Sequence, residues 1–162
     1  MAFRVGIGYD VHRKARGRPL VLGGVRFDTD WGLEGHSDAD VVVHAVADAL
    51  LGAVALGDIG KHFPPGEPRW KDAPSLEILR LVRAMVEGVG GRVVNADVTV
   101  VAEAPRIAPV REIMAANLAQ ELRVSNGRIS IKATTSETLG ALGRGEGLAA
   151  WAVVLVETAE TE

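Results

Sequence analysis

Two side chains suited to metal binding stand two residues apart near the start of the chain. The stretch from Val5 to His12 begins with alternating apolar residues, as a strand does, and ends on Asp10 and His12. Because residues i and i+2 of a strand point to the same side, this pattern presents a carboxylate and an imidazole together. We expect a strand over residues 2–9, with the Asp-x-His pair at the end where the strand leaves the core.

A third metal-binding side chain is expected on the helix predicted over residues 41–56. Its polar residues, counting the preceding Asp40, are Asp40, His44 and Asp48, which are four residues apart and so lie along one face. A set of two histidines and one aspartate leaves one position of tetrahedral Zn²⁺ open, as in catalytic zinc sites. Asp40 or Asp48 is then the candidate to hold the other ring nitrogen of His44. The alternative is that Asp10 pairs with a basic residue and His44 is a hydrogen-bonded helix histidine.

Three further segments carry groups suited to anions. His36, Ser37 and Asp38 precede the predicted helix, where backbone N–H groups and an imidazole attract an anion, or where Ser37 simply caps the helix. Residues 132–137, KATTSE, suit a phosphate with Mg²⁺, but this pattern is also that of a capping box, which the residues alone favour. Residues 143–147, GRGEG, allow close backbone approach around an arginine and a glutamate, for an anion or a subunit contact.

The composition narrows the class of protein. A length of 162 residues fits one domain, and with 48% hydrophobic but only 4% aromatic residues the core must be built mainly from Val, Ala and Leu. The 18 basic and 21 acidic residues are nearly balanced and form no basic stripe, which argues against nucleic-acid binding. The absence of Cys excludes disulfides and thiolate metal sites and suits the cytoplasm. No signal peptide and no membrane-spanning apolar run are found, so no membrane partner is expected.

The remaining elements must position these groups. A basic loop is expected over residues 13–18, a Gly-Gly hairpin over 20–27 and a long loop over 57–74. The other predicted elements are helices over 75–87 and 110–122, and strands over 93–103, 128–134 and 148–157. Because strands and helices do not alternate strictly, we predict a single α+β domain over residues 1–162, with a mixed sheet, helices on one face and a small hairpin.

Five segments, taken together, resemble one family in order and spacing. They are GYDVH, GLEGHSDADVVVHAVADALLGAVALGDIGKHFP, VTVVAEAPR, IKATTSETLG and GRGEG. The chain is similar to the 2-C-methyl-D-erythritol 2,4-cyclodiphosphate synthase family of the non-mevalonate isoprenoid pathway. The resemblance implies a lyase whose substrate is 4-diphosphocytidyl-2-C-methyl-D-erythritol 2-phosphate. The 2-phosphate attacks the β-phosphate, and CMP leaves as the cyclic diphosphate forms.

The resemblance also implies roles for particular residues. It places Zn²⁺, one per subunit, at Asp10, His12 and His44. It places Mg²⁺ or Mn²⁺ at Glu137, and credits His36 and Thr135 with stabilising the transition state. The part that holds methylerythritol phosphate matches Ser37, Asp58, Ile59, Gly60 and Phe63. The part that holds the cytidine nucleotide matches Ala102, Ala104, Pro105, Arg106, Ile107, Ala108, Thr134 and Thr135. Arg144 matches a substrate-binding and subunit-contact position.

The family assembles as a homotrimer, which implies active sites at subunit interfaces, with the zinc ligands and the cytidine pocket from different chains. Its central channel is proposed to bind isoprenoid diphosphates, and Ala141, where an aromatic is frequent, puts that role in doubt here. Arg106 replaces a common lysine and Pro65 a common acid. Two alternative functions are a zinc-dependent phosphohydrolase that uses the same three ligands and a non-catalytic trimer that binds isoprenoid diphosphates.

Overall fold

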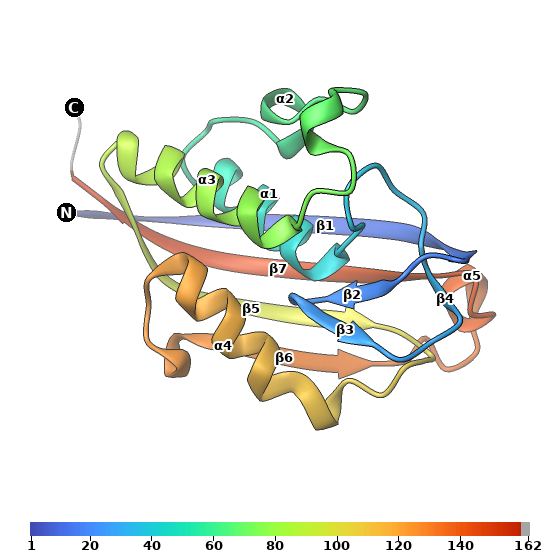
Figure 1. The fold of residues 1–162 in the computed structure, drawn as a ribbon. Helices are drawn as coiled ribbons and strands as arrows, with labels where there is room; N and C mark the ends of the chain where they lie inside the picture. Colours follow the sequence, from blue (N-terminus) through green and yellow to red (C-terminus); the bar gives the residue numbers. More distant parts are fainter. Residues whose placement is uncertain (160–162) are drawn as a thin grey trace.

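A five-stranded mixed sheet forms the centre of the molecule in a computed structural model, which describes residues 1–159 (Figure 1). Its strands, in spatial order, are β4 (Trp31–Leu33), β1 (Ala2–Arg16), β7 (Gly147–Thr158), β5 (Gly91–Val101) and β6 (Ile129–Thr134). All neighbours pair antiparallel except β5 and β6, which are parallel. The predicted hairpin is confirmed as a separate two-stranded sheet of β2 (Leu20–Leu22) and β3 (Val25–Phe27).

The helices are α1 (Val41–Ala53), α2 (Ile59–His62), α3 (Ser75–Gly88), α4 (Arg111–Leu122) and α5 (Gly140–Gly143), with 3₁₀ turns η1 (Pro68–Trp70), η2 (Ala108–Val110) and η3 (Asn126–Arg128). The three long helices, α1, α3 and α4, lie over one face of this sheet, whereas α2 packs on α1 and α5 lies at the end of the sheet where β7 begins (Figure 1). Helix α1 packs on β1 and β7, α3 packs on α1, and α4 packs on β6. The predicted α+β class is therefore confirmed. Within residues 1–159, none of the helices has the length and apolar composition needed to cross a membrane.

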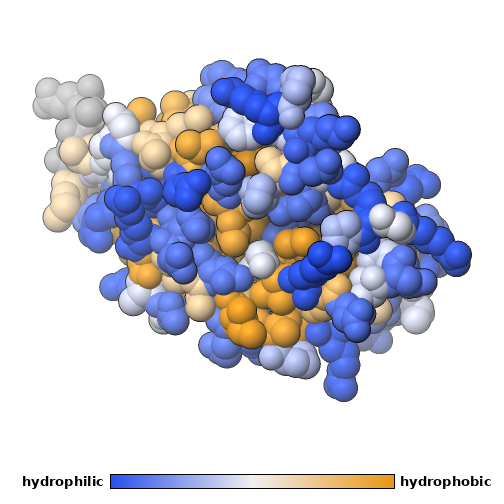
Figure 2. Space-filling model, in the orientation of Figure 1, coloured by the Kyte–Doolittle hydropathy of each residue, from blue (hydrophilic) through white to orange (hydrophobic). Residues whose placement is uncertain are grey.

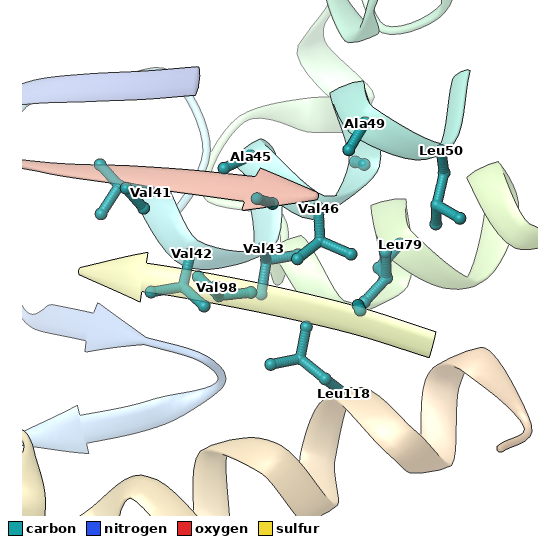
Figure 3. Packing of buried hydrophobic residues seen from close by; sticks show 14 of the residues in the cluster. Val41, Val42, Val43, Ala45, Val46, Ala49, Leu50, Leu79, Val98 and Leu118 are labelled. Atoms are coloured by element: carbon teal, nitrogen blue, oxygen red, sulfur yellow. The ribbon is translucent and has the colours of Figure 1, made fainter. Parts of the chain in front are cut away.

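The core between helices and sheet is built from aliphatic side chains, as the composition predicts. Val42 and Val46 of α1 are fully buried in one cluster with Val98 of β5, Leu79 of α3 and Leu118 of α4 (Figure 3). Burial of each such side chain contributes about 1.5–3 kcal/mol. The helical face that carries these residues fixes how α1 is rotated, and hence where its polar residues point.

Two glycines bring α1 unusually close to the sheet. A Cβ atom on Gly6 would lie 1.8 Å from the carbonyl oxygen of Ala49, and one on Gly8 would lie 1.9 Å from that of Ala45. No side chain fits at these distances, so only glycine lets the helix backbone rest directly on β1. This contact sets the height of α1 above the strand that carries Asp10.

The opposite face of the sheet is apolar and open. Side chains of β1 and β7 that point away from the helices include Phe3, Val5, Ile7, Trp151 and Val153, and Ile7 is 71% exposed. The rings of Tyr9 and Trp151 contact each other across the two strands, with centroids 4.6 Å apart. By contrast, the face seen in Figure 1 is mainly hydrophilic at its surface, with smaller hydrophobic patches between (Figure 2).

Strand β1 is much longer than predicted. It continues through Asp10 and His12 to Arg16, because Arg13 pairs with Gly147 of β7 and Lys14 pairs with Leu33 of β4. The prediction of a basic loop over residues 13–18 was therefore wrong for its first four positions. Asp10 and His12 therefore lie inside a paired strand, not at its end.

Local polar contacts account for the other differences. Helix α1 ends at Ala53, and its N-cap is Asp40, not Ser37, because the Asp40 carboxylate accepts the N–H groups of Val42 and Val43. The segment predicted as a loop over 57–74 contains α2 and η1, and the glycine-rich segment before β7 contains α5. Elements α3, α4, β5, β6 and β7 match their predictions to within one or two residues.

Candidate metal centre and adjoining pockets

Asp10 and His12 lie on the same side of β1, as their spacing predicts. The Asp10 Oδ2 atom is 3.0 Å from His12 Nε2, and both side chains are about four-fifths buried. The second ring nitrogen of His12, Nδ1, lies 2.6 Å from the carbonyl oxygen of Glu34. A backbone acceptor at Nδ1 holds the imidazole with Nε2 directed toward Asp10.

His44 of α1 completes the group. Its Nδ1 atom lies 3.0 Å from Asp10 Oδ2, and the three ligand atoms of Asp10, His12 and His44 all lie within 4.8 Å of one another. Nitrogen and carboxylate oxygen are the donors that Zn²⁺ uses, and three protein ligands with an open fourth position are usual for catalytic zinc. The donor set therefore fits a metal ion, as predicted.

The second ring nitrogen of His44 is not held by either predicted acid. His44 Nε2 lies 2.9 Å from the Oγ of Ser75 and 3.2 Å from the Oγ of Ser37. Asp40 is occupied elsewhere, because its carboxylate caps α1 and also accepts two N–H groups from the β2–β3 turn. The Asp48 carboxylate accepts the N–H of Ile59 at 2.8 Å and so fixes α2 to α1.

Burial and neighbouring charge set the protonation of the group. Burial acts to raise the pKa of Asp10, but the hydrogen bonds and charges of His12 and His44 outweigh it and lower that pKa to about 2. Burial acts to lower the pKa of His12, but the hydrogen bond and charge of Asp10 raise it above 6.5. Asp10 is thus ionised at neutral pH, the form that binds a cation.

Two structural acids nearby have raised pKa values. Burial, with the charge of Asp38, raises the pKa of Asp40 to about 6 against the opposing effect of its backbone N–H donors. Burial also raises the pKa of Asp48, although its hydrogen bond from Ile59 acts the other way. Both acids position elements around the metal centre rather than bind the metal.

A cavity of about 210 Å³ adjoins the candidate metal centre. It is lined by Asp10, His12, His44, His36, Ser37, Ile59, Gly60, Phe63, Pro65, Trp70 and Ile78. Five residues predicted to act on or bind the methylerythritol part of a substrate are thus brought together with the metal ligands. The sixth, Asp58, does not line the cavity; its carboxylate accepts the N–H of Lys61 and caps α2.

The residues predicted to bind a nucleotide line a different cavity, of about 300 Å³. Its walls include Ala102, Pro105, Arg106, Ile107, Ala108, Thr134 and Thr135, with Glu103, Arg111 and Ala133 in addition. Ala104 belongs to the same loop but does not line the cavity. Within the described chain the two cavities share no residue, so the predicted site falls into two separate halves.

Glu137 and Arg144 lie outside both cavities. Glu137 follows β6, where its N–H donates to Thr135 Oγ1 at 3.1 Å and its carboxylate accepts from the same hydroxyl at 3.2 Å. The capping-box interpretation of residues 132–137 was wrong, because the next helix, α5, has Leu139 as its N-cap and no side-chain cap. Arg144 donates from Nε to Glu146 at 2.6 Å.

Sequence reasoning did not identify Ser75, Asp38 or Glu34 as partners of this centre. Ser75 was expected only as the start of a helix, and nothing local indicates which distant ring it meets. The alternating glycines Gly6 and Gly8 were a usable signal, since glycine inside an apolar strand often marks close approach of another backbone.

The fold and the site together define an α+β protein with a partly buried Asp-His-His candidate metal centre beside a cavity of about 210 Å³. The model of the YgbB family matches residues 3–157, and the chain belongs to that family. It is 58% identical over 153 residues to 2-C-methyl-D-erythritol 2,4-cyclodiphosphate synthase of Moorella thermoacetica, covering 94% of each chain. It is 54% identical over 155 residues to the protein of that name from Geobacillus kaustophilus, covering 96% of this chain and 98% of the relative.

A solved structure gives the same fold. The IspF–CDP complex of Plasmodium falciparum superposes with a TM-score of 0.85 at 30% identity, covering 98% of each chain. The match spans the whole sheet and its helical layer, so the arrangement that places the two cavities is that of the family.

Proposed function

We propose that this chain converts 4-diphosphocytidyl-2-C-methyl-D-erythritol 2-phosphate to 2-C-methyl-D-erythritol 2,4-cyclodiphosphate with release of CMP. The observation that carries the proposal is the convergence of Asp10, His12 and His44 at one end of the cavity that His36 and Ser37 line. Relatives that are more than half identical over nearly the full length bear the name of this activity. The family resemblance of the sequence motifs points the same way.

The reaction needs positioning and charge stabilisation more than covalent chemistry. A 2-phosphate oxygen forms a bond to the β-phosphorus, and the bond from that phosphorus to the bridging oxygen breaks, so that CMP leaves with the electron pair. The attacking phosphate is already ionised at neutral pH, so no side-chain nucleophile is required. Holding the two ends of one substrate together supplies up to roughly 7–11 kcal/mol through effective concentration.

The chain's own residues divide this work. Asp10, His12 and His44 would hold Zn²⁺, which when bound supplies a Lewis acid for a phosphoryl oxygen. His36 and Ser37 offer an imidazole and a hydroxyl to the methylerythritol phosphate, and Ile59 and Phe63 give the cavity an apolar wall. Each of these groups is oriented before substrate binds, which reduces the reorganisation needed in the transition state.

We assign the second cavity to the cytidine nucleotide. Its support is that the loop around Pro105 forms part of the cavity wall together with Thr134 and Thr135, whose side chains carry hydroxyl groups. Glu137 is a single carboxylate next to these hydroxyls, and Mg²⁺ or Mn²⁺ is commonly held by one carboxylate together with substrate phosphates. A related structure, the Plasmodium falciparum protein, is described as a CDP complex.

We also propose that the active protein is a homotrimer of this single domain, with each active site completed between subunits and one Zn²⁺ per subunit. The open apolar face formed by Phe3, Val5 and Ile7 supports association, since monomeric proteins seldom leave so large an apolar patch in water. The separation of the two cavities on one chain supports a shared site. A role for the channel in binding isoprenoid diphosphates and a cytoplasmic location remain predictions, as does the subunit-contact role of Arg144.

One experiment tests the reaction directly. The purified protein is incubated with the substrate, with and without a chelator, while CMP is measured and the phosphorus products are followed by NMR. We expect CMP and a cyclic diphosphate, both abolished by the chelator and restored by metal. Inorganic phosphate as the product would instead identify a phosphohydrolase. Saturable binding of isoprenoid diphosphates without CMP release would identify a binding protein.

A further inference from the structure

The ring of His44 is held from behind by buried hydroxyl groups. Its Nε2 atom, on the side away from Asp10, lies 2.9 Å from Ser75 Oγ, and Ser75 is fully buried at the start of α3. Ser37 Oγ lies somewhat farther from the same nitrogen, at 3.2 Å. These two hydroxyls are the only hydrogen-bond partners of this nitrogen in the described chain.

The Asp38 carboxylate lies behind Ser75 and is not one of the candidate metal ligands. Asp38 Oδ1 is hydrogen-bonded to Ser75 Oγ, and Asp38 Oδ2 accepts the N–H of Ser75 at 2.9 Å. Asp38 Oδ1 also accepts the N–H of Asp40 at 3.2 Å, which fixes the carboxylate in place. An ionised carboxylate can only accept, so the Ser75 hydroxyl must donate its hydrogen to Asp38.

The direction of the Ser75–Asp38 hydrogen bond determines which group donates in the hydrogen bond between Ser75 and His44. With its hydrogen given to Asp38, Ser75 Oγ has lone pairs left with which to accept the Nε2–H of His44. With its Nε2–H held by Ser75, His44 is turned so that Nδ1 faces Asp10, and a metal ion that binds Nδ1 takes the place of the hydrogen that Nδ1 shares with Asp10 Oδ2. The ring is thereby held in the orientation that a metal ligand requires.

We propose that Asp38 and Ser75 act as a buried hydrogen-bonded relay that positions His44 as a metal ligand. Both are positioning residues, since neither lines the cavity or is among the three metal-binding side chains. The inference rests on the metal site of the proposed function, which it extends by two residues. It replaces Asp40 and Asp48 in the role that the helix pattern had suggested for them.

Ser37 serves as the internal comparison. It is farther from His44 Nε2 than Ser75 is, and among residues 1–159 its hydroxyl has no hydrogen bond to a carboxylate. Its Oγ accepts the N–H of Ala39 at 3.3 Å, and the residue lines the cavity. The relay therefore predicts that the two serines differ: Ser75 matters for metal affinity, and Ser37 for substrate.

A structural role for Asp38 must be separated from the relay. Helix α3 begins after Pro74, which supplies no side-chain cap, and the Asp38 carboxylate takes that place by accepting the Ser75 N–H. Substitution of Asp38 therefore also weakens the start of α3. Ser75→Ala keeps this N–H and removes only the hydroxyl, so it tests the relay without removing the cap.

The test measures zinc affinity without substrate, in the full chain, by competition with a chromophoric chelator. We expect Ser75→Ala to raise the zinc Kd by about 10- to 100-fold and Ser37→Ala to leave it within about twofold. Asp38 acts on His44 only through Ser75, so the two substitutions should not add. The double variant Asp38→Asn/Ser75→Ala should have a zinc Kd no higher than that of whichever single variant binds zinc more weakly. The visible absorption of the Co²⁺-substituted protein should change in Ser75→Ala and not in Ser37→Ala.

Three results would overturn the relay: a zinc Kd within about twofold of wild type in Ser75→Ala, an equal loss in Ser37→Ala, or additive losses in the double variant. The melting temperatures of the metal-free variants show whether a substitution unfolds the protein. If it does so in part, the Co²⁺ spectrum still reports on the molecules that remain folded. Failure of the proposed reaction is seen separately, as absence of CMP release from wild type that binds zinc normally.

Discussion

Asp10 contacts both imidazoles of the candidate metal centre, so it links the two histidines as well as offering a ligand atom of its own. Its Oδ2 atom is 3.0 Å from a ring nitrogen of each. Asp10→Asn removes the negative charge that attracts a cation, and His44→Ala removes one of the three ligand atoms. We expect either change to abolish bound zinc, measured by elemental analysis, and CMP release together. Full turnover in a variant shown to be free of zinc would disprove this assignment.

The raised pKa of Asp40 predicts that the folding stability depends on pH. Its pKa is raised to about 6 in the folded protein from 3.8, so between those values the folded state binds more protons than the unfolded chain. Asp40 therefore contributes to the free energy of unfolding at low pH, and this contribution is lost as the pH rises from about 4 to 6. Relative to Asp40→Asn, which cannot titrate, the metal-free wild type should lose stability on the order of 3 kcal/mol over that range.

Chemical denaturation of both proteins at pH 4, 5, 6 and 7, in the presence of a chelator, measures this difference. The variant also loses one acceptor for the β2–β3 turn, and that cost does not vary with pH. A stability difference that stays constant from pH 4 to pH 7 would show that Asp40 titrates normally.

At the scale of elements, the approach of α1 to β1 positions the site. A Cβ atom at Gly8 would overlap the carbonyl oxygen of Ala45, one residue from His44. Gly8→Ala should therefore push the helix off the strand, destabilise the fold by about 3 kcal/mol and weaken zinc binding. Gly52→Ala is the matched control, because nothing lies within 4 Å of its added Cβ and alanine favours a helix. Equal melting temperatures for wild type and Gly8→Ala would refute the close packing.

At the scale of the whole molecule, the open sheet face predicts how the chains associate. Ile7 is 71% exposed in the middle of this face, while Ile113, 54% exposed, lies on α4 on the helical side. Ile7→Lys should place a charge in the proposed subunit interface and convert the trimer to monomers, with loss of turnover. Ile113→Lys should remain trimeric. Analytical ultracentrifugation distinguishes these outcomes, and a monomeric wild type or a trimeric Ile7→Lys would contradict the proposal.

Much of the fold could be read from local patterns. The alternation before Asp10, the Gly-Gly turn of β2 and β3, and the apolar spacing in α3 each depend on residues that are neighbours in sequence. The early end assigned to the first strand was wrong because β1 continues by pairing with β4 and β7, and polar residues such as Arg13 and Lys14 give no hint of such partners. The helices α2 and α5 were not predicted either, because four residues are too few to show a helical pattern in the sequence.

Periodicity alone places Asp10 beside His12 and puts His44 on the polar line of its helix, and the family resemblance joins the three as candidate metal ligands. Their surroundings do not follow from the sequence. Asp10 and His44 are 34 residues apart and His44 and Ser75 are 31 apart, and those contacts exist only because Gly6 and Gly8 let α1 settle on the sheet and α3 packs over it. Side-chain direction is a local property of the backbone, whereas the partner of a buried polar atom depends on which distant segments are packed against it.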